Sequence, residues 1–86
     1  GVTRDVSIVT RVPILASKIL VTARDAGGEL LKSVEFFDYR NVDGARYFSL
    51  RLFFRADDRT LTGEEVTTVE NEIVDTLISK LGVTRR

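Results

Sequence analysis

The fold is decided by residues 47–66, which read YFSLRLFFRADDRTLTGEEV. The first half, Tyr47–Ala56, is rich in aromatic and apolar residues and predicts a strand. Thr62 and Glu65 then match a capping box, in which the hydroxyl and the carboxylate each accept a hydrogen bond from a free N–H at the start of a helix. Apolar residues recur on one face after this cap, and Gly82 stands where a C-terminal cap belongs, so we predict a helix over Thr62–Leu81.

The rest of the chain adds strands on both sides of this unit and one more helix. The patterns predict a strand over Val2–Val12, a helix over Ile14–Ala26, a strand over Ser33–Arg40, a turn over Asn41–Gly44 and a short last strand over Val83–Arg86. The order β-α-β-β-α-β is that of a split βαβ, or ferredoxin-like, α+β fold. We therefore expect a four-stranded antiparallel sheet with both helices on one face, and the other face open.

Composition excludes most kinds of enzyme. The 86 residues form one domain, 1–86, and include neither cysteine nor histidine, which removes disulfides, thiolate ligands and the usual general base. Asp57 and Asp58 supply too few oxygens for a calcium site, and we expect them to cap a helix or form a turn. The sequence also contains no glycine-rich phosphate loop. We therefore expect no catalytic residue, metal or cofactor in this domain.

The ends and the hydropathy of the chain suggest its context. It contains no methionine and begins with Gly1, which indicates a piece of a longer protein. No apolar run is long enough to cross a membrane and no signal peptide is evident, so we expect a cytoplasmic domain.

Basic residues outnumber acids up to Arg55, whereas acids dominate from Asp57 to Asp75. This asymmetry is compatible with a mixed soluble surface or with a basic face for a polyanion opposite an acidic helix.

The alternation along Tyr47–Ala56 separates a buried face from an open one. Phe48, Leu50, Leu52 and Phe54 are expected under the helices, which leaves Ser49, Arg51, Phe53 and Arg55 on the open face. Arginine binds phosphate and an exposed ring stacks on a base, so this set suits single-stranded RNA.

The neighbouring strand leaves other readings open. Glu35 and Phe37 would share the open face if Val34 and Phe36 point inward, and Asp38 could accept hydrogen bonds from a base edge. Two alternatives remain: the arginines pair with acids such as Asp5 or Glu35 and Phe53 packs on another domain, or the fold serves a regulatory role with a small molecule.

Four short motifs together resemble a known family. They are Arg4-Asp5, Phe36-Phe37-Asp38-Tyr39, Ser49-Leu50-Arg51-Leu52 and the run from Asp58 to Glu65. In this order the motifs resemble the ferredoxin-fold anticodon-binding domain at the C-terminus of the bacterial phenylalanyl-tRNA synthetase beta subunit. The likeness spans essentially the whole chain. For Arg4-Asp5 and Asp58-Arg59 we favour a structural role, in which charged pairs hold the ends of adjacent elements together.

The resemblance implies a module that binds the anticodon region of the phenylalanine tRNA. Its partners would be the rest of the beta subunit and the alpha subunit, where aminoacylation uses ATP and magnesium, with no membrane involved. Asp38 and Ser49 match positions that approach the anticodon bases, and Arg86 matches a terminal basic residue. The chain departs from the family in its short loop 41–46 and in Tyr47-Phe48, which replace the usual lysines.

Overall fold

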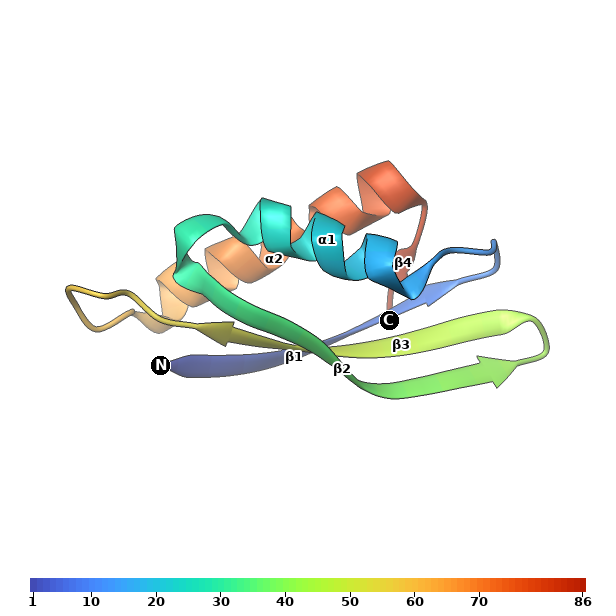
Figure 1. Ribbon diagram of the computed structural model, residues 1–86, viewed down its shortest axis with the longest axis horizontal. Coiled ribbons are helices and arrows are strands. Elements are labelled where there is room, and N and C mark those ends of the chain that lie inside the picture. Colours follow the sequence, from blue (N-terminus) through green and yellow to red (C-terminus); the bar gives the residue numbers. More distant parts are fainter.

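The computed structural model describes residues 1–86 and has the expected order of elements (Figure 1). These are β1 (Val2–Thr10), α1 (Ala16–Gly27), a short 3₁₀ turn η1 (Gly28–Leu30), β2 (Leu31–Val42), β3 (Ala45–Phe54), α2 (Gly63–Leu81) and β4 (Thr84–Arg85). The strands form one antiparallel sheet in the order β2-β3-β1-β4, and both helices lie on the same side of it. The predicted ferredoxin-like α+β fold is confirmed.

The core lies between the sheet and the helices. The predicted alternation of β3 is confirmed, because the residues expected under the helices are buried while Arg51 is exposed. Apolar side chains from both helices meet this strand, so burial of one sheet face holds the two layers together. The largest fully buried side chains of the core are Ile8, Ile19, Leu50, Leu52, Phe54, Val66, Ile73, Val74 and Leu77.

Helix α2 begins and ends as its sequence predicts. The Thr62 hydroxyl accepts from the Glu65 N–H at 3.2 Å, and the Glu65 carboxylate accepts from the Thr62 N–H at 3.2 Å. At the other end Gly82 is left-handed, with φ of 71°, and its N–H donates to the Ile78 carbonyl at 3.0 Å.

Neither helix combines the length and the apolar composition that crossing a membrane requires.

The hairpin turn is tighter than the predicted turn. Only Asp43 and Gly44 lie outside the strands, with φ of 50° and 82°. Positive φ at both central residues makes a two-residue turn whose twist matches that of the strands. As a result β2 continues to Val42 and β3 begins at Ala45, two residues before the predicted start at Tyr47.

The connection from β1 to α1 is longer than predicted. The Thr10 hydroxyl accepts from the Val12 N–H at 3.2 Å and turns the chain there, so β1 ends at Thr10 instead of Val12. Helix α1 then begins at Ala16 rather than Ile14, without a side-chain cap.

Strand β2 contains a bulge that the alternation does not predict. Phe36 pairs with Leu50 and Asp38 pairs with Ser49, so Phe37 is the extra residue. A bulge shifts the faces of all later residues by one position. Asp38 therefore faces away from the helices, whereas Tyr39 lies on the helix side, with its ring centre 5.0 Å from that of Phe48.

Candidate nucleic-acid interface

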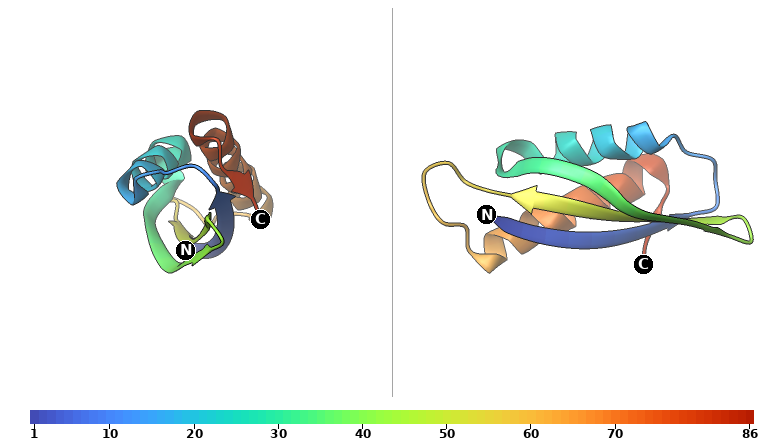
Figure 2. Two further views of the ribbon diagram at one scale, coloured as in Figure 1. Left: turned by 90° about the vertical axis from the view of Figure 1, so that its right-hand side faces the viewer. Right: turned by 60° about the horizontal axis from the view of Figure 1, so that its bottom comes forward.

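One face of the sheet is not covered by the helices (Figures 1 and 2). Strand register assigns alternate side chains to this uncovered face. We refer to the following residues as the open face: Thr3, Asp5, Ser7 and Val9 of β1, Glu35, Phe37, Asp38 and Arg40 of β2, Tyr47, Ser49, Arg51 and Phe53 of β3, and Arg86.

Five of the six residues predicted to contact RNA fall into two groups along the β2–β3 pair, and the sixth, Arg86, follows β4. Asp38 and Ser49 are directly opposite each other near the middle of the sheet, with Arg51 two residues along. Arg55 lies beyond the end of β3, about 20 Å from Ser49 at roughly 3.3 Å per strand residue. A ligand of one or two nucleotides does not reach both groups.

Arg51 is held by an acid of the neighbouring strand. Its Nε donates to Asp5 Oδ1 at 2.9 Å and its Nη2 donates to Asp5 Oδ2 at 3.1 Å. The guanidinium lies 4.5 Å from the ring centre of Phe37, which is therefore also on the open face. The hydrogen bonds from Arg51 hold the pKa of Asp5 below its usual value, and Asp5 in turn raises the pKa of Arg51. Much of the charge of Arg51 is thus neutralised within the sheet.

The other predicted residues of the middle of the sheet are less constrained. The hydroxyl oxygens of Ser49 and Ser7 lie 3.3 Å apart, so each can still bond to a ligand. Asp38 is half exposed, and its carboxylate lies 3.8 Å from the Arg40 guanidinium. This is a loose pair that leaves the Asp38 oxygens available as acceptors.

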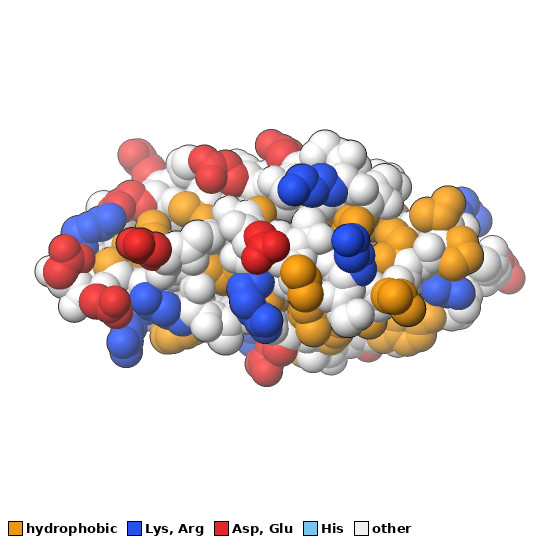
Figure 3. All heavy atoms as spheres, turned by 45° about the horizontal axis from the view of Figure 1, so that its top comes forward, with side chains coloured by type: hydrophobic (Ala, Val, Ile, Leu, Met, Phe, Trp, Pro, Cys, Tyr) orange, Lys and Arg blue, Asp and Glu red, His pale blue; other side chains and the backbone are white.

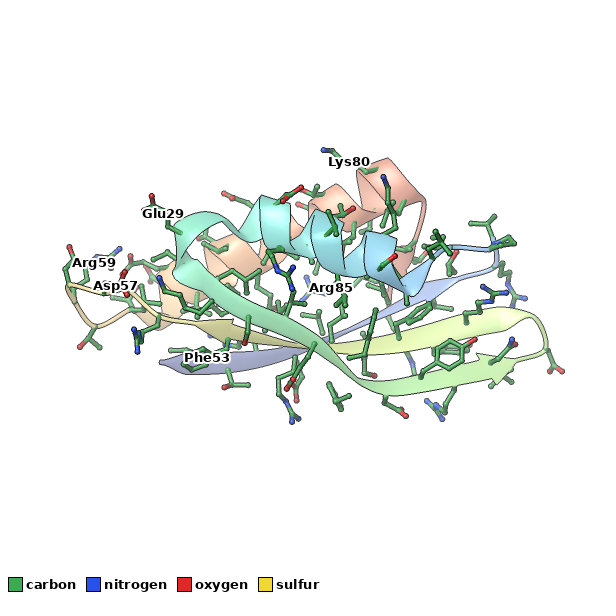
Figure 4. The ribbon with its side chains drawn as sticks, in the orientation of Figure 1. Glu29, Phe53, Asp57, Arg59, Lys80 and Arg85 are labelled. Atoms are coloured by element: carbon green, nitrogen blue, oxygen red, sulfur yellow. The ribbon has the colours of Figure 1, made fainter.

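Phe53 and Arg55 form the far end of the predicted site. The ring of Phe53 lies on the uncovered side of the sheet (Figure 4), where the backbone of Gly1 packs against it. Arg55 is exposed and its Nη2 lies 3.5 Å from Asp57, which also pairs with Lys32 at 3.4 Å. The shared carboxylate reduces the positive charge of this end.

Arg40 and Tyr47 are among the open-face residues that sequence reasoning missed. The guanidinium carbons of Arg40 and Arg86 lie 5.8 Å and 5.1 Å from the ring centre of Tyr47. Tyr47 is two residues before Ser49 in β3, so the alternation of that strand could have predicted its place on the open face. The place of Arg40 could not be predicted in this way, because the bulge at Phe37 decides its face.

The structural role expected for the charged motifs is found for most of their members. Arg4 pairs with Glu70 of α2 at 3.4 Å, and Arg59 pairs with Glu65 of the capping box. The exception is Asp58, which forms no hydrogen bond or ion pair. The prediction that Asp58 ties the turn is therefore wrong, and Arg59 alone does so.

The open face is of mixed charge rather than strongly basic. Asp5, Glu35 and Asp38 lie among its arginines. The opposite, helix-side surface also carries both signs of charge, and its apolar side chains gather toward one end (Figure 3). The sequence asymmetry between a basic first part and an acidic α2 thus does not produce a uniformly basic sheet.

The lowered pKa values of Asp5 and Glu65 make the stability of the fold depend on pH. The backbone N–H of Thr62 and then the Arg59 side chain lower the pKa of Glu65, as Arg51 does for Asp5. The unfolded chain therefore binds more protons than the folded one in acid. We expect the contribution of both groups to be complete above their ordinary values of 3.8 and 4.5, and to be lost as the pH falls through the lower folded values.

This pH dependence is measured by the urea midpoint at pH 6, 4 and 3. Asp5→Asn with Glu65→Gln is the comparison variant, and it should lose less stability between the first and last of these pH values. An equal loss in both proteins would assign the acid sensitivity to other carboxyls.

The chain matches known proteins over its full length. The model of the ferredoxin-fold anticodon binding domain family matches residues 1–86. The phenylalanine–tRNA ligase beta subunit of Symbiobacterium thermophilum is 41% identical over 81 residues, which cover 90% of this chain and 9% of the relative. That of Trichormus variabilis is 42% identical over 87 residues, covering 96% of this chain and 11% of the relative.

A more distant relative is the corresponding subunit of Bacillus cereus, 33% identical over 90 residues that cover the whole chain and 11% of the relative. The chain thus spans about a tenth of the length of these curated relatives. The family model and the fold agree, and the sequence resemblance is confirmed. The chain belongs to the ferredoxin-fold anticodon-binding domain family.

Proposed function

We propose that this chain is the tRNA-binding module of a phenylalanine–tRNA ligase beta subunit, acting in the cytoplasm on the anticodon region of the phenylalanine tRNA. The observation that carries the proposal is the open face, where arginine, aromatic and hydroxyl side chains lie together on the side of the sheet that no helix covers. Such a surface stacks bases and binds phosphates without any catalytic group. The names of the relatives supply the choice of tRNA.

Each predicted residue has a role in this proposal. Asp38 accepts hydrogen bonds from base N–H groups, and Ser49 donates to or accepts from a base or sugar. Arg51, held by Asp5, is a positioned donor rather than a free cation. Phe53 stacks, and the exposed Arg55 and Arg86 contact phosphate.

The chemistry of aminoacylation belongs to other parts of the parent protein and to its alpha subunit. No group of three or more acidic side chains is placed to hold a metal ion. In this proposal we assign ATP and magnesium to the catalytic part of the parent.

Titration of the chain with two tRNAs tests the proposal. At low salt, the phenylalanine tRNA should bind more tightly than the same tRNA with an altered anticodon, because only the first presents the bases that the open face would read. Binding is followed by electrophoretic shift or by NMR of the labelled chain. Equal or undetectable binding of both would overturn the anticodon role of this domain.

A matched pair of double variants identifies the face. Arg55→Ala with Arg86→Ala should weaken binding and reduce the salt slope by about 2, one for each phosphate contact. Lys18→Ala with Lys80→Ala removes the same charge from the helix side and should leave binding nearly unchanged. Figure 4 shows Lys80 on the far side of α2 from the sheet. A larger loss in the lysine variant would place the RNA on the helices.

A further inference from the structure

The hairpin end of the open face contains an aromatic ring between two arginines. The ring centre of Tyr47 lies 5.1 Å from the guanidinium carbon of Arg86 and 5.8 Å from that of Arg40. Both distances are within the roughly 6 Å over which a cation is attracted to a ring face, although Arg40 is near that limit. We refer to Arg40, Tyr47 and Arg86 as the tyrosine cluster.

The three members come from β2, from β3 and from the residue that follows β4. Arg40 and Tyr47 are directly opposite each other in the β2–β3 pair. Arg86 is anchored by its backbone, since its N–H donates to the Ser7 carbonyl at 3.0 Å. The preceding Arg85 points to the helix side and bonds to Glu70 at 2.7 Å, which fixes the short strand that presents Arg86 (Figure 4).

Positive charge is less compensated here than elsewhere on the sheet. In the middle, Arg51 makes two hydrogen bonds to Asp5 and faces Glu35 across the β2–β3 pair. In the tyrosine cluster, Arg86 makes no ion pair, and Arg40 has only the 3.8 Å contact with Asp38. A phosphate gains most where a guanidinium is not already engaged by a carboxylate.

From this geometry we infer that the tyrosine cluster is the main nucleotide-holding element of the open face. An unpaired base stacks on the Tyr47 ring, displacing the loosely held Arg40, and the two guanidiniums bind the flanking phosphates. This inference rests on the proposed RNA-binding function and goes beyond it, because it places the main contacts at the hairpin end, on Tyr47 and Arg40 as well as Arg86.

Tyrosine fluorescence tests the stacking directly. The chain has two tyrosines and no tryptophan, so Tyr39→Phe leaves Tyr47 as the only strong fluorophore. The anticodon stem-loop of the phenylalanine tRNA should quench Tyr47 in this variant, because a stacked base lies on the ring. Inorganic tripolyphosphate, which has charge but no base, should bind weakly and leave the emission nearly unchanged.

Affinity measurements complete the test. Tyr47→Ala should weaken stem-loop binding by about 5- to 150-fold, the loss expected for one base stacked on an aromatic ring. Tyr47→Phe should bind almost as the parent does, since the ring remains. Tyr39→Ala is the matched control, because it removes a half-exposed ring from the opposite face of the same hairpin.

The outcomes separate this inference from the proposed function. Stem-loop binding without quenching, with unchanged affinity for Tyr47→Ala, would overturn the tyrosine cluster and leave the RNA-binding proposal standing. Equal losses in Tyr47→Ala and Tyr39→Ala would also overturn it, as a general effect on the hairpin. No stem-loop binding by the parent chain at low salt would overturn both.

Discussion

Replacing Glu70 with alanine should lower the free energy of unfolding by about 2 kcal/mol, because it removes the nearly buried acid that joins α2 to the sheet. Its two carboxylate oxygens lie 2.7 Å from Arg85 Nη2 and 3.4 Å from Arg4 Nη1. Loss of a partner from a fully buried pair costs roughly 3–5 kcal/mol. Both arginines are partly exposed and would turn to water, which reduces the cost.

The same substitution should also loosen β4 and weaken RNA binding. This strand has only two residues, and the Arg85 to Glu70 bond is its strongest side-chain attachment to α2. Without that bond the amide of Arg86 should exchange its hydrogen faster. The Arg86 side chain should also no longer be held beside Tyr47 in the tyrosine cluster. Urea denaturation and amide exchange measured by NMR check the two effects.

Two variants control for the loss of a glutamate. Glu70→Gln keeps the shape and one acceptor and should cost about half as much as Glu70→Ala. Glu72→Ala removes an exposed acid of the same helix and should change stability by less than about 0.5 kcal/mol. If Arg86 exchange is unchanged in Glu70→Ala, β4 is held by the burial of Val83 instead.

The elements predicted well from the sequence are those whose signals are local. The capping box at Thr62, the left-handed Gly82 and the apolar stripe between them all act within a few residues of where they stand. The alternation of β3 is similar, because a central strand with one face in the core has a fixed period of two. These signals therefore place β3 and α2, two of the six elements in the predicted order.

The features that were missed depend on contacts between distant residues. The bulge at Phe37 is defined by the partner strand, and nothing within β2 itself marks it. It decides that Asp38 and Arg40, rather than Tyr39, share the open face. Likewise, which acid pairs with Arg51 follows from strand register, so the sequence could name Asp5 or Glu35 but not choose between them.

Replacing Gly27 with alanine should destabilise the protein by about 2 kcal/mol, although the residue ends a helix with an ordinary φ of −75°. Helix propensity alone would favour alanine by roughly 1 kcal/mol. A methyl group on Gly27, however, would lie 2.5 Å from Leu31 Cβ and 2.9 Å from its Cγ. Leu31 is buried at the start of β2 and its Cβ cannot swing away, so overpacking should outweigh propensity.

Gly63→Ala provides the opposite case in the same chain. Gly63 is the first residue of α2, and a methyl group there would meet nothing within 4 Å. Alanine should therefore leave stability unchanged or raise it by up to about 0.5 kcal/mol, mainly by restricting the unfolded chain. Thermal or urea denaturation of both variants measures the difference. If Gly27→Ala proves as stable as Gly63→Ala, the start of β2 moves to make room for the added methyl group, and the close approach of Leu31 does not require glycine at position 27.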